Sequence, residues 1–490
     1  DFKKNLTPKM RLQLASRLTL PKKAQALRRV WIPKPGKTQK RPLGIPTLED
    51  RAMQALAKLA LEPEWEAQFE GHSYGFRPGR STHDAVKYLF LSLHKQDKYV
   101  LDADISKCFD CINHDKLLEK LKTFPLLRRA VKAWLNAGVM EGDKLFPVES
   151  GTPQGGVLSP LLANIALHGL EDYIKSAFHK EKAYGTLKYA SWQPTVVRYA
   201  DDFVILHRDL DELKRAKELA IQWLSRMGLS LNPQKTRIGH TLNKIEGQEP
   251  GFDFLGFNIR QYPLGKRNRR WVVVGNYQRL AGHKTIITPT KDAIARHKQK
   301  LSDIIDKLKT APQEKLIGAL NPVIRGWANY YATVNSNETF RAIDNWLFIK
   351  LLRWASRRHP MKSKHWITAK YWAIESKGIW EFTDGTKSLL QHRHTKLRMH
   401  VNVKDSRSPY DGDWKYWSAR RGKYPGIKSR LAATLKQQNG RCCHCKLYFR
   451  PEDIIEIHHL DGNRKNNTRS NLQALHGHCH DFIHKNKVRV

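Results

Sequence analysis

Val196-Val197-Arg198-Tyr199-Ala200-Asp201-Asp202-Phe203-Val204-Ile205-Leu206 is the stretch that decides the fold. β-Branched and aromatic residues flank Ala-Asp-Asp on both sides, which predicts two short strands joined by a tight turn. Such a hairpin places two carboxylates at its tip, where they repel each other unless a divalent cation neutralises them. Mg²⁺ held by carboxylates and substrate phosphates is typical of nucleotidyl transfer. A solvated Asp-Asp turn is the bland alternative, and this segment alone does not decide between the two.

A second segment, residues 99–110, supplies a third carboxylate. It alternates like a half-buried strand, so Asp102 and Asp104 share one face, with Asp104 placed 97 positions before Asp201. Residues 151–160 then form a turn rich in glycine and proline that opens an apolar helix. Such a turn lets a nucleotide approach the backbone closely, although a single glycine loop is weak evidence.

The composition indicates a polyanionic partner. The chain has 87 Lys+Arg against 46 Asp+Glu and a formal charge of +41, and its 14 Trp, 16 Tyr and 17 Phe can stack on bases. No run of 18 apolar residues exists, so no membrane span is expected. A length of 490 residues predicts two to four domains. The chain begins at Asp1 rather than Met, which favours a trimmed sequence, and no signal peptide is visible.

The N-terminal region carries two basic turns. Residues 1–30 are expected to be helical and basic, and residues 30–46 to form a hairpin around a Pro/Gly/Lys turn. Lys34, Lys40 or Arg41 in this hairpin would contact a triphosphate, unless the segment is only a solvated basic loop. A helix over residues 48–67 follows. After it comes a second basic turn at 73–82, in which Arg77 is a further candidate for contacting the nucleotide.

Seven motifs, taken in order, resemble those of reverse transcriptases encoded by group II introns. They span most of the chain: Arg41-Pro42-Leu43-Gly44-Ile45-Pro46, Tyr74-Gly75-Phe76-Arg77, Asp104-Ile105-x-x-x-Phe109-Asp110, Thr152-Pro153-Gln154-Gly155-Gly156, Tyr199-Ala200-Asp201-Asp202, Asn232-Pro233-x-Lys235-Thr236 and Phe254-Leu255-Gly256-Phe257. The preserved order is far more specific than any single motif.

The resemblance implies an α+β right-hand polymerase with fingers and palm over residues 1–275. Asp104, Asp201 and Asp202 match the family's metal-binding triad, where two Mg²⁺ ions would activate the primer 3′-OH and stabilise the leaving pyrophosphate. Asp102 and Asp110 are expected to have structural or hydrogen-bonding roles.

Three further residues are assigned to the nucleotide by the same resemblance. Phe109 would lie beneath the incoming sugar and favour dNTPs, because its ring would clash with a 2′-OH. Gln154 would lie along the nucleotide or template. Lys235 is a candidate acid for the departing pyrophosphate, with a surface lysine as the alternative.

Residues 276–375 are expected to form a three-helix thumb, which in this family is the maturase (X) domain. Helices are predicted over residues 293–308, from Ile317, and over 340–356, and Arg325-Gly326-Trp327-x-x-Tyr330-Tyr331 is similar to the family pattern. Most of these rings are expected to be ordinary helical core. From Arg341 to Arg430 there are 21 Lys+Arg against 7 Asp+Glu, so residues 376–432 are predicted to bind DNA, with a loop or linker over 405–413.

The last 58 residues, 433–490, suggest a metal domain. Two ligand pairs, Cys442-x-x-Cys445 and His476-x-x-Cys479, have spacings that suit a structural Zn²⁺, with Cys443 as an alternative ligand. Four of the six cysteines lie here, which fits a metal site better than disulfides.

The pattern between and after these pairs resembles an HNH endonuclease with a ββα-metal core, with His476 where many relatives have cysteine. The resemblance implies His459 as general base, Asn471 as support for its loop, and His458, His480 and His484 as ligands of a catalytic divalent ion. A purely structural zinc knuckle is the rival interpretation.

We therefore expect a group II intron-encoded reverse transcriptase and maturase with a C-terminal HNH endonuclease. It would bind its intron RNA, assist splicing, nick target DNA and copy the RNA from that primer with dNTPs (retrohoming), in the bacterial cytoplasm and at the nucleoid. A defence-type reverse transcriptase and a splicing cofactor without catalysis are the alternatives. The C-terminal segment argues against the first, and the intact carboxylates and histidines argue against the second.

Overall fold

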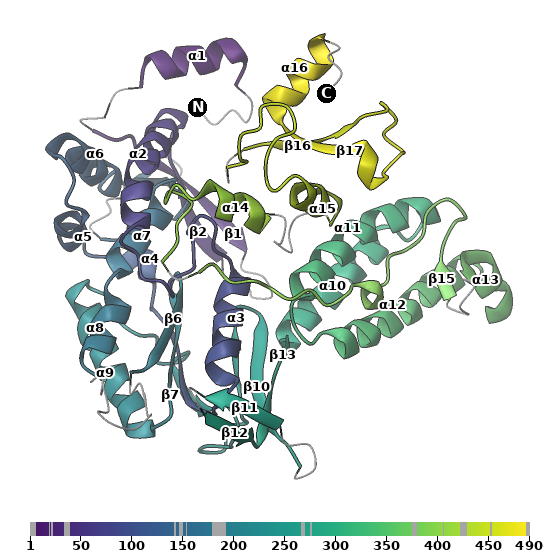
Figure 1. Ribbon diagram of the computed structural model, residues 1–490, viewed down its shortest axis with the longest axis horizontal. Helices are drawn as coiled ribbons and strands as arrows, with labels where there is room; N and C mark the ends of the chain where they lie inside the picture. The colour runs from purple at the N-terminus through teal and green to yellow at the C-terminus, as the bar shows by residue number, and fades with distance from the viewer. Residues whose placement is uncertain are drawn as a thin grey trace. The chain divides into compact units, whose positions relative to one another are not determined.

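The computed structural model describes residues 6–18, 20, 23–33, 40–141, 144–146, 150–152, 154–178, 193–265, 270–274, 277–374, 380–404, 406–421, 429–450 and 453–486 (Figure 1). Two compact units form. The first comprises residues 1–252, 261–284 and 402–413, and the second comprises 253–260, 285–401 and 414–490. Among the described residues, no helix is both long and apolar enough to cross a membrane.

A four-stranded sheet at the centre of the first unit carries the predicted carboxylates. Its order is β6 (Thr195–Tyr199), β7 (Asp202–His207), β3 (Tyr99–Asp104) and β8 (Arg237–His240), and all three pairings are antiparallel. Strand β7 is buried at every position after its first residue because helix α9 (Leu210–Arg226) packs against β7 and β3. Helix α3 (Thr82–Leu93) packs against β6 on the other side in Figure 1. The predicted hairpin and the predicted strand are both confirmed.

A second sheet of the first unit contains the basic hairpin. Strands β1 (Leu27–Pro33) and β2 (Lys40–Ile45) pair antiparallel, and β4 (Val139–Glu141) and β5 (Lys144–Phe146) continue the order β2-β1-β4-β5. The expectation that residues 1–30 are helical was largely wrong, because helix α1 covers only Pro8–Ser16 and Leu27 already begins a strand. β-Branched and aromatic residues at Val30, Trp31 and Ile32 favour that strand.

Helices enclose the core of the first unit. Helix α2 (Leu48–Glu66) begins at Thr47, whose hydroxyl accepts from the Asp50 N–H, and this helix confirms the prediction for residues 48–67. The remaining helices of this unit are α4 (Cys108–Cys111), α5 (His114–Leu121), α6 (Pro125–Leu135), α7 (Ser159–Leu167) and α8 (Leu170–Ser176). The strand pair β11 (Arg270–Val274) and β12 (Tyr277–Ala281) also belongs to this unit. Strands β9 (Phe252–Phe254), β10 (Phe257–Pro263) and β13 (His283–Pro289) form a sheet in the order β13-β10-β9, and their residues are divided between the two units.

Residues 402–413 belong to the first unit although they are distant from it in sequence. The Val403 N–H donates to Asp84 Oδ1 at 3.0 Å, and Tyr410 Oη donates to Glu62 Oε2 at 2.9 Å. The Arg407 carbonyl accepts from Arg80 Nη2 at 3.2 Å. The predicted loop over 405–413 is therefore a packed connector without helix or strand in its described part, Asp405 being outside it.

Three long helices of the second unit confirm the three predicted helices. They are α10 (Lys291–Lys307), α11 (Gln313–Tyr331) and α12 (Asn337–Arg358) (Figure 1). Apolar side chains from all three form one core with Ile367 and Trp372. The aromatic rings lie mostly in this packing, as expected, since Trp327 stacks on His297 with centroids 4.4 Å apart. The Tyr331 hydroxyl donates to the Gly256 carbonyl at 3.1 Å. Smaller elements follow: α13 (Lys364–Tyr371), β14 (Trp372–Ile374), β15 (Trp380–Phe382) and η2 (His392–His394).

The C-terminal part of the second unit has a ββα arrangement. Helices α14 (Trp414–Arg421) and α15 (Ser429–Gln437) precede it. Strand β16 (Ile455–His459) pairs antiparallel with β17 (Leu472–His476), and helix α16 (Gly477–Asn486) follows directly. The short turn η3 (Arg469–Asn471) leads into β17. The order of elements in this part of the chain is therefore strand, strand, helix.

Candidate functional site

The hairpin tip and the end of β3 bring three carboxylates to one edge of the central sheet. Asp104 is the last residue of β3 and stands opposite Asp202, the first residue of β7. Asp201 lies in the two-residue turn, and its carbonyl accepts from the Ile105 N–H at 3.2 Å. Antiparallel register therefore joins residues that are about a hundred positions apart in the chain.

Burial and, after it, charge repulsion raise the pKa values of the carboxyl groups at this edge. Burial, the neighbouring Asp201 charge and a hydrogen bond with Asp104 raise the pKa of Asp202 from 3.8 to about 7. Burial and the Asp104 charge also raise the pKa of Asp201. Lys235 Nζ lies 2.8 Å from Asp104 Oδ2, so one cation already offsets part of the negative charge. Acidic oxygens that crowd together in this way form a donor set that suits a divalent cation.

The turn between β6 and β7 is stabilised by contacts with side chains and backbone packed against it. Ala200 has a φ of +58°, a conformation that L-residues rarely adopt. Its carbonyl accepts from Arg198 Nη1 at 3.3 Å, and the same nitrogen donates to Asn164 Oδ1 at 3.1 Å. Gly75 packs so closely on the turn that an added Cβ would lie 2.4 Å from the Ala200 nitrogen. Arg198 and Asn164 were missed by sequence reasoning because they act through distant contacts. Gly75, which lies inside a quoted motif, had been given no role.

Arg77 has a different role from the predicted nucleotide contact. Its guanidinium is fully buried and makes an ion pair with Glu66 at 2.9 Å, while Nη1 donates to the carbonyls of Glu70 and Ser73. Every nitrogen of the guanidinium therefore has a protein partner, and none faces a substrate. The physical reason is that a buried arginine is stable only when paired and hydrogen-bonded. Arg77 stabilises the turn that presents Tyr74 and Gly75.

Among the residues predicted to contact the nucleotide, Arg41 is near enough to Asp201 for its charge to offset part of the rise in the pKa of that carboxyl. Phe109 is half-buried on α4, its carbonyl accepts from the Thr152 N–H at 2.5 Å, and its ring meets Phe76 edge-on at 6.0 Å. Gln154 is half-buried, and its carbonyl accepts from the Gly44 N–H at 2.7 Å. This bond joins the glycine-rich loop to strand β2, where Lys40 and Arg41 are exposed. Lys34 lies outside the described residues. Phe76 is a further aromatic side chain that the sequence argument did not single out.

Two sets of Cys and His side chains converge in the C-terminal part of the second unit. Ligand atoms of Cys442, Cys445, His476 and Cys479 lie within 4.8 Å of one another. Cys443 is not among them, so the geometry favours Cys442 over the alternative. Burial would raise the pKa of Cys442, but the N–H groups of Cys445, His476 and His444 hold it lower, which favours the thiolate that zinc binds. Burial and the charge of Cys442 raise the pKa of Cys479 to about 12, so the thiolate is favoured at only part of this set. His476 Nε2 lies 3.2 Å from Asp453, the kind of outer contact that orients a ligating histidine.

The second set consists of His458, His480 and His484, again within 4.8 Å of one another. The buried His458 Nδ1 has no hydrogen-bond partner among the described residues, and His480 is oriented by Glu456 at 2.9 Å. An unpartnered imidazole nitrogen beside two others suits a divalent cation. Within the described residues these are the two sets that meet this distance. Asp104, Asp201 and Asp202 do not meet this distance.

His459 and Asn471 lie beside the second set. His459 ends β16, and its Nε2 lies 3.2 Å from Asn467 Oδ1. Asn471 Oδ1 accepts from the Asp461 N–H at 3.0 Å, and its amide donates to Asp461 Oδ1 at 2.8 Å. Asn471 therefore fixes the loop that follows His459, and a shallow pocket of about 370 Å³ contains His458, His459, His480 and His484.

Comparisons with known proteins agree with the polymerase geometry. The family described as "Reverse transcriptase (RNA-dependent DNA polymerase)" matches residues 32–259, and "Group II intron, maturase-specific domain" matches residues 294–372. The first match covers the carboxylate edge, and the second covers helices α10 to α12. The fold and site thus define a reverse transcriptase joined to a maturase domain.

Individual relatives narrow this class. The chain is 27% identical over 555 aligned residues to the group II intron-encoded protein LtrA of Lactococcus lactis subsp. cremoris, covering 94% of this chain and 86% of the relative. It is 33% identical to protein YkfC of Escherichia coli (strain K12), covering 49% and 68%, and 30% identical to a 91 kDa protein in the cob intron of Schizosaccharomyces pombe, covering 61% and 43%. This chain belongs to the family of group II intron-encoded reverse transcriptases and maturases.

Proposed function

We propose that this protein nicks target DNA with its C-terminal domain and extends the exposed 3′-OH by copying intron RNA. The observation that carries the nuclease half is the convergence of two separate Cys and His ligand sets on one ββα arrangement. A structural zinc knuckle would need only the first set. The second set, with His459 beside it, supplies what strand cleavage requires.

The polymerase residues are proposed to act in the following way. Asp104, Asp201 and Asp202 would hold two Mg²⁺ ions, which lower the pKa of the primer 3′-OH and stabilise charge on the departing pyrophosphate. Lys235 would donate a proton to that pyrophosphate, since its ion pair with Asp104 places its amino group beside this site.

Other residues would bind and select the nucleotide. The exposed Lys40 and Arg41 would contact the triphosphate, with Gln154 along the nucleotide or template. The Phe109 ring would exclude a 2′-OH and so favour dNTPs.

The nuclease residues divide into a scaffold and a reaction centre. Cys442, Cys445, His476 and Cys479 would hold a structural Zn²⁺ that ties β17 and α16 to residues 442–445. His458, His480 and His484 would hold a divalent ion that stabilises charge on the scissile phosphate. With Nε2–H donating to Asn467, the other ring nitrogen of His459 is free to take a proton from the attacking water. Asn471 would hold the loop that follows His459 in place through its bonds to Asp461.

The partners follow from these roles. Helices α10 to α12 match the maturase-specific domain, which implies binding of intron RNA and assistance to splicing. Residues 376–432 would contact target DNA through their excess of Lys and Arg. We place the reaction in the bacterial cytoplasm at the nucleoid, where such RNA and DNA meet.

A coupled assay separates the two activities. Ribonucleoprotein carrying the chain's own intron RNA is incubated with an end-labelled DNA target, Mg²⁺ and dNTPs. We expect His459→Ala to lose nicking and cDNA together on intact target, but to make normal cDNA on a target supplied already nicked. Asp201→Ala should nick normally and make no cDNA on either target. If His459→Ala still nicked the target, the proposed role of His459 in a nuclease would be contradicted, and the assignment as a reverse transcriptase would be unaffected.

A further inference from the structure

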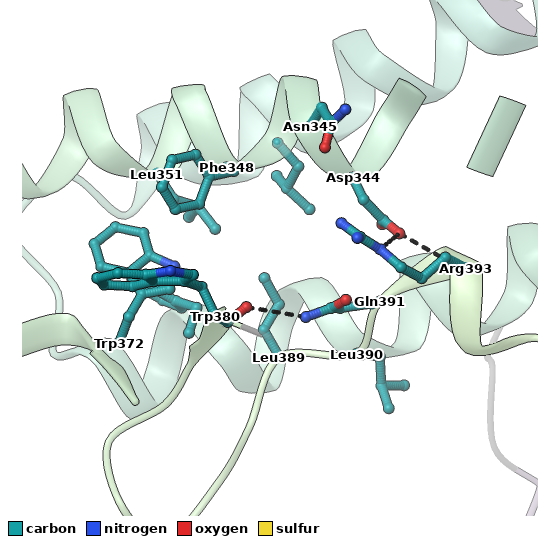
Figure 2. A pocket seen from close by; sticks show the side chains of 12 residues that line it. Asp344, Asn345, Phe348, Leu351, Trp372, Trp380, Leu389, Leu390, Gln391 and Arg393 are labelled. Carbon is teal, nitrogen blue, oxygen red and sulfur yellow. Dashed lines mark hydrogen bonds and ion pairs between the residues drawn. The ribbon is translucent and has the colours of Figure 1, made fainter. Parts of the chain in front are cut away.

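A pocket of about 350 Å³ opens between helix α12 and the β14–β15 pair in the second unit (Figure 2). Its interior is apolar and well packed, since Leu351, Trp372 and Phe382 are each less than 7% exposed. The rim is different, because Trp380 is 44% exposed and Leu390 is 37% exposed. An accessible indole beside an apolar hollow provides a surface on which a flat ring can stack.

Polar groups line one side of this pocket. Asn345 lies on the exposed part of α12 and has no hydrogen-bond partner among the described residues. The Gln391 amide nitrogen donates to the Trp380 carbonyl at 3.1 Å, but its buried Oε1 lacks a partner within the described chain. Arg393 is anchored by its Nε to Asp344 at 3.2 Å, and Figure 2 shows its side chain below α12. Amide groups near a stacking surface are what proteins use to read the edges of unpaired bases.

A strongly basic groove adjoins the pocket on the neighbouring face of α12. Its volume is about 680 Å³, and Tyr371 lines it while the next residue, Trp372, lines the pocket. Asp306 is the one acidic residue among those that line this groove, against six cations: Lys309, Lys350, Arg353, Arg357, Arg358 and Lys370. Arg353 and Arg357 are exposed and form no ion pair within the described part of the chain. Such a groove attracts a phosphate backbone.

We propose that the pocket receives one unpaired nucleobase of the bound RNA, stacked on Trp380, while phosphates of the same strand contact the basic groove. The proposal rests on RNA binding by the maturase domain and names a site for it. The positive charge of the groove favours RNA over a protein partner as the occupant of the pocket. An aromatic side chain of a protein partner would fit the pocket but would bring no phosphates for six cations. A fully paired RNA stem would reach the groove but would leave the pocket empty.

The test compares two fluorescein-labelled RNA hairpins that differ by one bulged uridine in the stem. Binding to the full chain is measured by fluorescence anisotropy. We expect the bulged hairpin to bind about 5- to 150-fold more tightly, which is the range for stacking one base on an aromatic ring. Trp380→Ala should abolish this preference, Trp380→Phe should retain most of it, and Asn345→Ala should reduce it. Ile349→Ala is the matched control, because Ile349 is 50% exposed on the same helix and does not line the pocket.

The groove is tested separately. Arg353→Ala and Arg357→Ala should weaken both hairpins equally and reduce the salt dependence of binding, leaving the preference for the bulge unchanged. Equal affinity of the native chain for the two hairpins, or a preference that survives in Trp380→Ala, would overturn the pocket while leaving RNA binding intact. Failure to bind either hairpin would contradict the RNA-binding function itself and the pocket with it.

Discussion

Single residues decide how the carboxylate edge is assembled. The three aspartates could be found from sequence, because strand periodicity and a β-turn place them at strand ends. Arg198 and Asn164 could not, since their effect depends on hydrogen bonds made at the back of the turn. Arg77 shows the reverse error: a basic residue in a basic turn was expected to contact substrate, but its buried partner Glu66 lies eleven positions earlier on α2. Burial, which a single sequence does not display, separates the two roles.

Gly75→Ala tests the support of the hairpin turn. The added Cβ would lie 2.4 Å from the Ala200 nitrogen, so the turn carrying Asp201 must shift. We expect a loss of about 1–3 kcal/mol in the free energy of unfolding, as for overpacking, and a marked loss of cDNA synthesis. Urea denaturation and primer extension measure the two effects. Gly318→Ala is the matched control, because nothing lies within 4 Å of its Cβ and it should leave activity unchanged. Equal behaviour of the two variants would contradict this role.

Asp202→Asn should stabilise the protein while abolishing polymerisation. The folded-state pKa of Asp202 is raised from 3.8 to about 7, so between about pH 4 and pH 7 the folded state binds more protons than the unfolded state. Stability therefore falls as the pH rises through that window, and an uncharged amide removes the penalty. We expect about 1–3 kcal/mol of added stability at pH 7.5 without Mg²⁺, and less at pH 5. Urea denaturation at both pH values measures whether the variant is more or less stable than the native chain. Asp211→Asn is the control, because the Asp211 side chain is exposed. A destabilised Asp202→Asn at pH 7.5 would contradict it.

Some helices and segments could be predicted from the sequence, and others could not. Helices α10, α11 and α12 were predictable because their apolar positions recur locally at helical spacing. The segment 402–413 was not, since its Asp84 and Glu62 partners are more than 300 positions away. The C-terminal ligand sets lie between these cases. Pair spacing predicted Cys445 and Cys479 as ligands and left the choice between Cys442 and Cys443 open, and in the fold it is Cys442 whose sulfur lies near theirs.

Metal removal tests the C-terminal arrangement of elements. We expect the purified protein to contain one tightly bound zinc per chain, measured by mass spectrometry of the metal. Cys479→Ser should lose that zinc and melt residues 442–486, because a structural zinc site contributes directly to folding. Cys443→Ser is the control and should keep it. Zinc that is lost from Cys443→Ser and kept in Cys479→Ser would reverse the ligand assignment. The zinc site itself would be contradicted if the purified protein contained no zinc and its melting temperature did not change when a chelator was added.

At the scale of the whole molecule, one basic chain combines a polymerase, an RNA-binding maturase domain and a candidate nuclease. Motif order along the sequence predicted this combination, because each part is locally encoded and contiguous in the main. The formal charge of +41 is consistent with a protein whose substrates and partners are all polyanions. The chemistry of each part nevertheless depends on contacts within its own unit.

The most direct test of the central claim is primer extension on poly(rA)/oligo(dT) with dTTP and Mg²⁺. The native chain should synthesise cDNA, and Asp201→Ala should lower the rate at least about 100-fold, because the carboxylates that hold the catalytic metal are needed in the transition state. Asp211→Ala, an exposed carboxylate on α9, should behave like the native chain. Full-length cDNA made at the native rate by Asp201→Ala would contradict the assignment of the β6–β7 hairpin as the polymerase centre.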